Sequence, residues 1–483
     1  MPAPKFDLSA AARQEMIDQG FQPDFAPGTD EQLAAIKTRT APVADAQVCD
    51  LRSLLWSSID NDSSRDLDQA EVAERVANGI RVLVAIADVD ATVAMGTPID
   101  NHASQQTTTV YTGIRTFSML PEVLSTDMTS LNENVDRLSI VVEFVVAADG
   151  TIASSDIYRA LVRNQAQLTY NGVGPWLEGT AAPPPKVAAS AALQAQLKLQ
   201  DEATQLLRAE RNRMGALNMN RVEADPQIVN GEVTGINTRE ENRATELIEN
   251  FMVAANGAMA STLGKAGVSS IRRIVKTPER WPRIVELAAK YGETLPATPD
   301  SGALNAFLQR RQTADATHYA DVSLAVVKLM GPGEYVVMHP GDPEQGHFAL
   351  AVRDYTHSTA PNRRFADTVT QRLIKAVLAK RPAPYSNAQL DAIAQNCNLK
   401  EEAARKVERN MGKRIAAVAL QPRIGETFSA VVTGVTPKGV FVRVLNPPAE
   451  GILVRGEGVD VGDKLQLKLI SADPRKGYID FIR

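Results

Sequence analysis

The segment that decides the interpretation of this chain is Ile59-Asp60-Asn61-Asp62-Ser63-Ser64-Arg65-Asp66-Leu67-Asp68-Gln69, in which four carboxylates fall within nine positions. Like charges at this spacing raise one another's pKa unless a cation offsets their repulsion. Hard divalent cations bind carboxylate oxygens, neutralise phosphoryl oxygens and activate water. The segment is therefore a candidate metal site of a protein that acts on phosphate groups.

Three interpretations of this segment compete. A magnesium site in an acidic loop beside a sheet is the first, and a solvated acidic turn is the second. The third is an EF-hand calcium loop, but its sixth position must be glycine and here is Arg65. The flanks, 54–59 and 80–89, have the β-branched pattern of strands rather than helices. The EF-hand ligand positions would be Asp60, Asp62, Ser64, Asp66, Asp68 and Glu71.

The acidic segment resembles the signature of the ribonuclease II/ribonuclease R family of 3′-to-5′ exoribonucleases, an Asp followed six positions later by D-x-D-D. Asp60, Asp66 and Asp68 match its first three acids, and Gln69 stands in place of the fourth. Further stretches resemble the family in the same order, and they extend from roughly residue 50 to residue 420. These stretches are 86–89, 109–111, 119–122, 130–132, 162–170, 247–256 and 359–365.

The resemblance implies a site for Mg²⁺, with Mn²⁺ as a possible substitute. Asp60, Asp66 and Asp68 would be its acidic ligands, and Asp68 resembles the most important acid of the family. Gln69 can offer a neutral carbonyl oxygen to the metal or its water, so we expect lower metal affinity. Asp62 is an extra acid that could compensate in part. We expect one tightly held cation, and a second that arrives with the substrate.

Two arginines follow a proline in a segment that resembles the S-P-I-R motif of the family. Arg363 is the candidate clamp for the scissile phosphate, because guanidinium forks match phosphate oxygens. A salt bridge with Asp367 is the alternative. Arg364 is expected to contact substrate as well. Residues 351–385 carry seven Arg or Lys against two Asp, which predicts a local phosphate-binding patch in a chain of net charge −5.

The resemblance also implies residues that hold the RNA end. Tyr111 would stack on the 3′-terminal base, and Tyr170 would read the 2′-hydroxyl. Glu408 would lie near the terminal ribose, although a glutamate on an amphipathic helix is also a common solvated residue. The second stacking position falls near Met219, which is not aromatic. The acid expected beside Tyr170 falls at Asn250, so selectivity for RNA over DNA could be looser.

The predicted fold class is α+β, with a ribonuclease II-type sheet wrapped by helices in 51–422. Residues 1–50 form a short helical element with helices at 8–19 and 30–38, either helix-turn-helix-like or an arm packed on the catalytic region. About 50 residues cannot hold a cold-shock barrel and its linker, so we expect the usual N-terminal cold-shock domains to be absent.

Residues 423–483 predict a separate module. Short β-rich runs broken by glycines indicate a five-stranded OB-fold barrel of the ribosomal-protein RNA-binding type. Barrels of this kind stack bases on strand aromatics, for which Phe428 and Phe441 are the candidates. Core packing is the alternative for each, and we expect one on the RNA face and one inside.

The remaining composition sets the expected environment and function. Cys49 and Cys397 show no metal-ligand spacing, and no apolar run is long enough to span a membrane, so we expect a monomeric cytoplasmic protein. The resemblance implies a magnesium-dependent hydrolytic 3′-to-5′ exoribonuclease that degrades single-stranded RNA to nucleoside 5′-monophosphates. The alternative, suggested by Gln69, is a catalytically weakened RNA-binding protein on the same scaffold.

Overall fold

The structure is a computed structural model, and it describes residues 6–39, 47–217, 223–229, 232–239, 241–343, 345–437, 439–456 and 458–483. Its α-helices are α1 Leu8–Asp18, α2 Thr29–Lys37, α3 Pro98–Gln106, α4 Tyr170–Leu177, α5 Pro185–Ala188, α6 Ala191–Arg213, α7 Arg243–Lys265, α8 Trp281–Lys290, α9 Ser301–Ala314, α10 Ala316–Met330, α11 Phe365–Leu378 and α12 Asn387–Leu420. Shorter helical turns are η1 Val89–Ala91, η2 Leu124–Met128, η3 Phe348–Leu350 and η4 Gln421–Arg423.

The strands fall into one large sheet, a barrel and three two-stranded ribbons. The sheet contains β1 Cys49–Asp50, β2 Trp56–Asp60, β3 Gln69–Val76, β4 Gly79–Ala87, β7 Asp136–Val146 and β8 Ile152–Thr169. The ribbons are β5 Val110–Tyr111 with β6 Thr116–Phe117, β9 Glu223–Val229 with β10 Glu232–Arg239, and β11 Ser270–Ile274 with β12 Glu334–Met338. The barrel contains β13 Thr427–Thr436, β14 Gly439–Leu445, β15 Pro448–Leu453, β16 Lys464–Asp473 and β17 Tyr478–Ile482.

The long strand β8 organises the large sheet, whose order is β1-β8-β2-β3-β4-β7. Its first two thirds, 152–163, pair with β7, and its last residues, 164–169, pair in parallel with β2. The Asp149-Gly150 pair, a dipeptide typical of hairpin turns, lies in the connection between β7 and β8. Gly150 has φ +83°, and a Cβ there would lie 2.2 Å from the carbonyl oxygen of Leu206, so the turn requires glycine.

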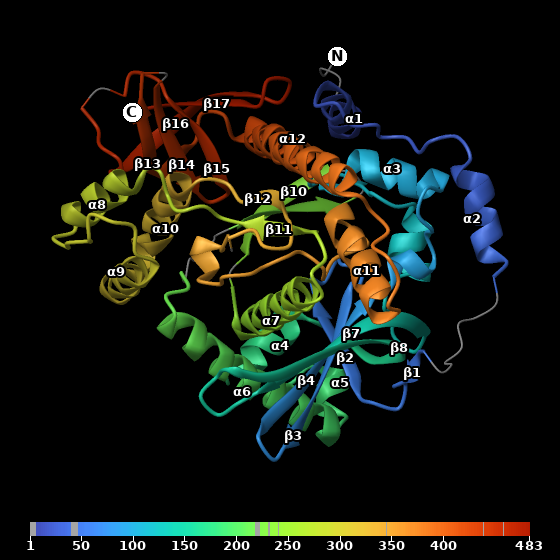
Figure 1. The fold of residues 1–483 in the computed structure, drawn as a ribbon. Coiled ribbons are helices and arrows are strands. Elements are labelled where there is room, and N and C mark those ends of the chain that lie inside the picture. The colour runs from blue at the N-terminus through green and yellow to red at the C-terminus, as the bar shows by residue number, and fades with distance from the viewer. Residues whose placement is uncertain are drawn as a thin grey trace.

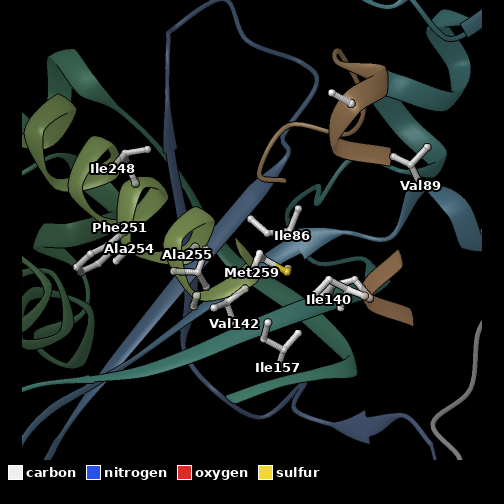
Figure 2. Packing of buried hydrophobic residues seen from close by; sticks show 14 of the residues in the cluster. Ile86, Val89, Ile140, Val142, Ile157, Ile248, Phe251, Ala254, Ala255 and Met259 are labelled. Atoms are coloured by element: carbon white, nitrogen blue, oxygen red, sulfur yellow. The ribbon is translucent and has the colours of Figure 1, made fainter. Parts of the chain in front are cut away.

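The main core lies between one face of the sheet and helix α7 (Figures 1 and 2). Figure 2 shows Ala255 and Met259 of α7 close to Ile86 of β4 and Val142 of β7. These side chains are fully buried, because the apolar residues of α7 recur at helical spacing while those of β4 form a continuous β-branched run. The packing fixes the sheet end from which the acidic segment emerges.

The N-terminal helices pack on different elements. Helix α1 lies on α12, where the buried Glu15 accepts hydrogen bonds from Arg414 at 3.0 Å and Asn410 at 2.8 Å. Helix α2 contacts α3 instead (Figure 1). Both N-terminal helices therefore pack on helices of the region that follows them in the chain. The N-cap of α2 is Gly28.

The C-terminal strands close into a five-stranded barrel in the order β13-β14-β15-β17-β16, as the glycine-broken pattern predicts. The barrel stands beside the C-terminal end of α12, and helices α8–α10 form a separate cluster with its own apolar core (Figure 1). The expected α+β class and OB-type barrel are therefore confirmed. Across the described residues, no helix is long and apolar enough to cross a membrane.

Candidate active site

The acidic segment forms the connection between β2 and β3, and both flanks are strands of the sheet. An EF-hand requires helices on both sides, so that interpretation is wrong. Asp60 ends β2 and closes the local turn. Its Oδ1 atom accepts hydrogen bonds from the Asn61 amide at 2.8 Å and the Ser64 hydroxyl at 2.7 Å. One oxygen of Asp60 therefore shapes the loop.

Three elements that are distant in sequence meet at Tyr111. The hydroxyl of Tyr111, at the end of β5, donates to Asp66 Oδ2 at 3.2 Å. The backbone amide of Tyr111 donates to Glu408 Oε1 of α12, also at 3.2 Å. Tyr111 keeps 42% of its surface exposed, so its ring remains available for contact from solvent.

Asp68 binds the segment that contains the predicted phosphate clamp. Its carboxylate is 2% exposed, and Oδ1 accepts the Asn362 amide at 3.0 Å. Oδ2 accepts from Arg363 Nε at 3.2 Å. The Arg363 side chain is 46% exposed, so its outer edge is open while its inner edge is held. The alternative salt bridge of Arg363 with Asp367 is wrong.

The partner of Asp367 is the neighbouring arginine. Arg364 precedes α11 and donates from Nη2 to Asp367 Oδ1 at 2.7 Å, and the carboxylate of Asp367 is fully buried. The side chain of Arg364 is 23% exposed, and its guanidinium group is held by Asp367. The expected substrate contact of Arg364 is therefore corrected to a structural ion pair that anchors the start of α11.

The basic stretch 351–385 is not the phosphate-binding patch that its composition predicts. Arg372 of α11 is buried and donates to Asp90 and Asp100, each at 2.7 Å. Lys375, one turn on, donates to Asp88 and Asp90, each at 2.8 Å. These cations neutralise acids of the same chain and are unavailable to phosphate. The exposed bases of the stretch are Arg353, Arg363, Lys380 and Arg381.

The carboxylates of the loop and of β3 carry more negative charge than their surroundings neutralise. Burial raises the pKa of Asp68 to about 7, although Arg363 opposes the shift. Burial also raises the pKa of Asp66, and the charge of Asp60 adds to the effect. The pKa of Glu71 lies well above its ordinary value, because of burial first and Asp60 second. A cation at this place would relieve the excess.

The carboxylates of the loop suit a magnesium ion for which the protein supplies only some of the ligands. In the ranges that the structure describes, no three His, Cys, Asp or Glu side chains converge as a complete metal cage. Mg²⁺ usually takes one or two protein carboxylates and fills its shell with water and substrate phosphates. Asp60 and Asp66, whose charges act on each other, fit that requirement.

The other two predicted ligands have different surroundings. Both oxygens of Asp68 are engaged by the Asn362–Arg363 segment, so its clearest task is to position Arg363. Gln69 is buried, and its amide donates to the Ile59 carbonyl at a long 3.4 Å. Asp62 is exposed and accepts from Asn171 at 2.5 Å, so it is a solvated charge at the rim.

The residues predicted to surround the 2′-hydroxyl lie on two different helices, α4 and α7. Tyr170 starts α4 and is partly buried against the main core. Asn250 and Glu249 of α7 both accept from Arg211, at 2.8 and 3.3 Å. Arg211 therefore binds the side chains at and beside the position where the resemblance places an acid. Met219 lies outside the described residues.

The two barrel phenylalanines differ in burial, as expected. Phe428 is 4% exposed and makes an edge contact with Phe481 inside the barrel core. Its predicted role in base stacking is corrected to core packing. Phe441 on β14 remains partly exposed and is the member of the pair that can meet a base.

Sequence reasoning missed two features of this site. Glu71 was considered only as the last ligand of a calcium loop, whereas it is a fully buried acid of β3. A charged residue between the apolar Ala70 and Val72 was the signal that could have identified it. Asn362 contributes through its backbone amide, for which the sequence has no signal.

Comparisons with known proteins place this geometry in a family. The RNB domain model matches residues 48–380, and the model of the RNase II-type exonuclease C-terminal S1 domain matches residues 426–483. The chain is 29% identical over 466 residues to Ribonuclease R 1 of Lactococcus lactis, covering 89% of this chain and 56% of that protein. It is 31% identical over 434 residues to Ribonuclease R of Escherichia coli, covering 86% and 52%. The chain thus spans about half the length of these curated relatives.

Solved structures show the same fold. RNase R of Mycoplasma genitalium, in complex with ribose methylated single-stranded RNA, superposes with a TM-score of 0.88 at 23% identity, covering 99% of this chain and 78% of that one. Yeast Ssd1, described as a pseudonuclease, superposes with a TM-score of 0.72 at 16% identity, covering 91% and 55%. With the RNB match over most of its length and the S1 match at its end, the chain belongs to the RNB family of RNase II-type proteins.

Proposed function

We propose that this chain is a hydrolytic exoribonuclease that removes nucleoside 5′-monophosphates from the 3′ end of single-stranded RNA with a divalent metal, Mg²⁺ or Mn²⁺. Family membership supports the proposed direction and product. The observation that carries the proposal is the meeting of the acidic loop, the half-exposed Arg363 and the exposed Tyr111 at one place.

The residues divide the work by their surroundings. A cation held by Asp60 and Asp66 would supply an activated water and neutralise charge on the scissile phosphate. Arg363, held from behind by Asp68, presents its free edge to phosphoryl oxygens. Tyr111 would offer its ring to the terminal base, and Glu408, which accepts the backbone amide of Tyr111, would lie near the terminal ribose.

The experiment is degradation of a 5′-labelled oligoribonucleotide with Mg²⁺, analysed on a sequencing gel and by chromatography of nucleotides. We expect a ladder that shortens from the 3′ end, together with nucleoside 5′-monophosphates. Asp68→Asn should slow the reaction at least tenfold, a barrier increase of about 1.4 kcal/mol or more. A variant with more than a tenth of the wild-type rate would refute the assignment of Asp68.

The second candidate is an RNA-binding protein with weak or no hydrolysis. Gln69 in place of the fourth acid favours it, and the fold is shared with a protein described as a pseudonuclease. The same labelled RNA separates the two candidates. Retention on a filter without mononucleotide release, over a range of Mg²⁺ and Mn²⁺ concentrations, would favour binding alone.

A further inference from the structure

Glu71, in the middle of β3, is a buried acid for which the described residues provide no partner. It is 0% exposed, and neither Oε1 nor Oε2 has a hydrogen-bond partner among the residues that the structure describes. The residue opposite it on β2 is Ser57, whose buried hydroxyl has no partner within the same described ranges. A buried carboxylate without hydrogen bonds costs free energy, and either a retained proton or a nearby cation lowers that cost.

The position of Glu71 points to the acidic loop. Side chains alternate along a strand, which places Glu71 on the same face of β3 as Gln69. The neighbouring Ala70 and Val72 pack into a different apolar cluster on the opposite face. The charge that acts on Glu71 is that of Asp60, which in turn acts on Asp66. Glu71 therefore extends this row of acids from the loop into the interior.

We propose that Glu71 is the buried counter-charge of the metal site, and that it supplies the negative charge that the family motif has at position 69. The inference rests on the proposed function, since it needs a cation at Asp60 and Asp66. A carboxylate in the interior is screened little by salt or water, so it can act on a nearby cation without touching it.

The other extra acid does not fit this role. Asp62 is exposed, and its carboxylate accepts a hydrogen bond from Asn171. A solvated charge at the rim is screened, so it adds little to cation affinity. Asp62 is therefore the matched control for Glu71, because both acids belong to the same strand-loop-strand unit.

The test is calorimetric titration of MnCl₂ into RNA-free protein, which reads metal binding without hydrolysis. Glu71→Gln keeps the shape and removes the charge, and it should raise the Kd for Mn²⁺ at least about tenfold. Asp62→Asn should change the Kd less than about twofold. Adding Gln69→Asp to Glu71→Gln should restore most of the lost affinity, because it returns the charge to the family position.

A wild-type Kd in Glu71→Gln, or no measurable Mn²⁺ binding by the wild-type protein, would overturn the proposal. Folding is checked by thermal unfolding in EDTA, where loss of an unpaired buried charge should leave the Tm equal or higher. Tight Mn²⁺ binding that depends on Glu71, without release of nucleotides from RNA, would instead sink the proposed function while leaving the counter-charge in place.

Discussion

Two acid clusters meet helix α11 and the segment before it, and they differ in how their charge is balanced. The acidic-loop cluster contains Asp60, Asp66, Asp68 and Arg363, and the salt-bridge cluster contains Asp88, Asp90, Asp100, Arg372 and Lys375. In the first, three acids share one half-exposed cation. In the second, three acids share three cations, since Arg159 lies 3.6 Å from Asp88 in addition to Arg372 and Lys375.

The pKa of Asp90 is shifted in the opposite direction from the pKa values of Asp66 and Asp68. Burial would raise the pKa of Asp90, but Lys375 and Arg372 lower it below the ordinary value. Burial raises the pKa of Asp66 and Asp68, and Arg363 does not reverse it. Acids that the chain has fully paired stabilise the fold, whereas acids that it leaves short of positive charge are available to bind a cation.

The largest expected effect is on stability, in the salt-bridge cluster. Arg372→Met should lower the free energy of unfolding by about 3–5 kcal/mol, because it leaves Asp90 and Asp100 short of their buried partner. Urea unfolding measures the loss. Activity per folded molecule should be unchanged, and a variant as stable as wild type would show that the pairing contributes nothing.

The converse is expected for Arg363→Met in the acidic-loop cluster. The rate of RNA hydrolysis should fall by roughly 100-fold, since under the proposed function the open edge of the guanidinium would bind the reacting phosphate. The free energy of unfolding should change by less than about 1 kcal/mol, because the side chain is half exposed. Arg363→Lys keeps the positive charge but lacks the paired N–H donors of the guanidinium group. Its rate should therefore lie between those of Arg363→Met and the wild-type protein. A large stability loss with normal turnover would reverse the comparison.

The clusters should also respond oppositely to pH in metal-free protein. Asp68 has a pKa of about 7 when folded and about 3.9 when unfolded, so the folded state keeps a proton that the unfolded chain releases. Its stabilising contribution is full below about pH 4 and is lost as the pH rises through about 7. Asp68→Asn does not titrate, so its stability relative to wild type should increase over that interval.

The free energy of unfolding should depend on the protonation of Asp90 in the opposite direction. Because the pKa of Asp90 is lowered in the folded state, its ionised form stabilises the fold above about pH 3.9, and this contribution is lost as the pH falls below that value. Urea unfolding of wild type, Asp68→Asn and Asp90→Asn in EDTA between about pH 3 and 8 compares the two. Parallel curves for both variants would contradict the distinction between the clusters.

The smallest expected effect extends the comparison to the barrel. Phe441→Ala should raise the Kd for single-stranded RNA about tenfold, since aromatic stacking contributes about 1–3 kcal/mol per base. Its Tm should change little. Phe428→Ala removes a buried ring and should instead destabilise the barrel by about 3–5 kcal/mol. Equal RNA affinity of Phe441→Ala and wild type would remove Phe441 from the binding surface.

The sequence predicts the elements of this fold well because they are local. The apolar spacing of α7, the glycine-broken barrel strands and the turn at Gly150 each depend on a few neighbouring residues. Pairings between distant segments are not local. Arg372 looks like a phosphate ligand beside other bases, because its partners Asp90 and Asp100 lie 282 and 272 residues away.

The same limit applies to the candidate site. The acids of the loop are visible as a motif, but the contact of Asp68 with Arg363 spans 295 residues. The sequence also offers Arg363 and Arg364 as equivalent neighbours. The turn before α11 gives one of them a half-exposed edge and ties the other to Asp367. Burial, which separates Phe428 from Phe441, likewise depends on barrel closure.

The last turns of α12 belong to two structural units at once. Ala416, Ala417 and Leu420 are buried in the same apolar cluster as the barrel residues Phe428 and Phe481. A fragment that begins at residue 423 would therefore open one side of the barrel to water. For protein engineering, the barrel and the end of this helix should therefore be moved together as one unit. Exchange of barrels between relatives should succeed only when the fusion point lies upstream of Ala416.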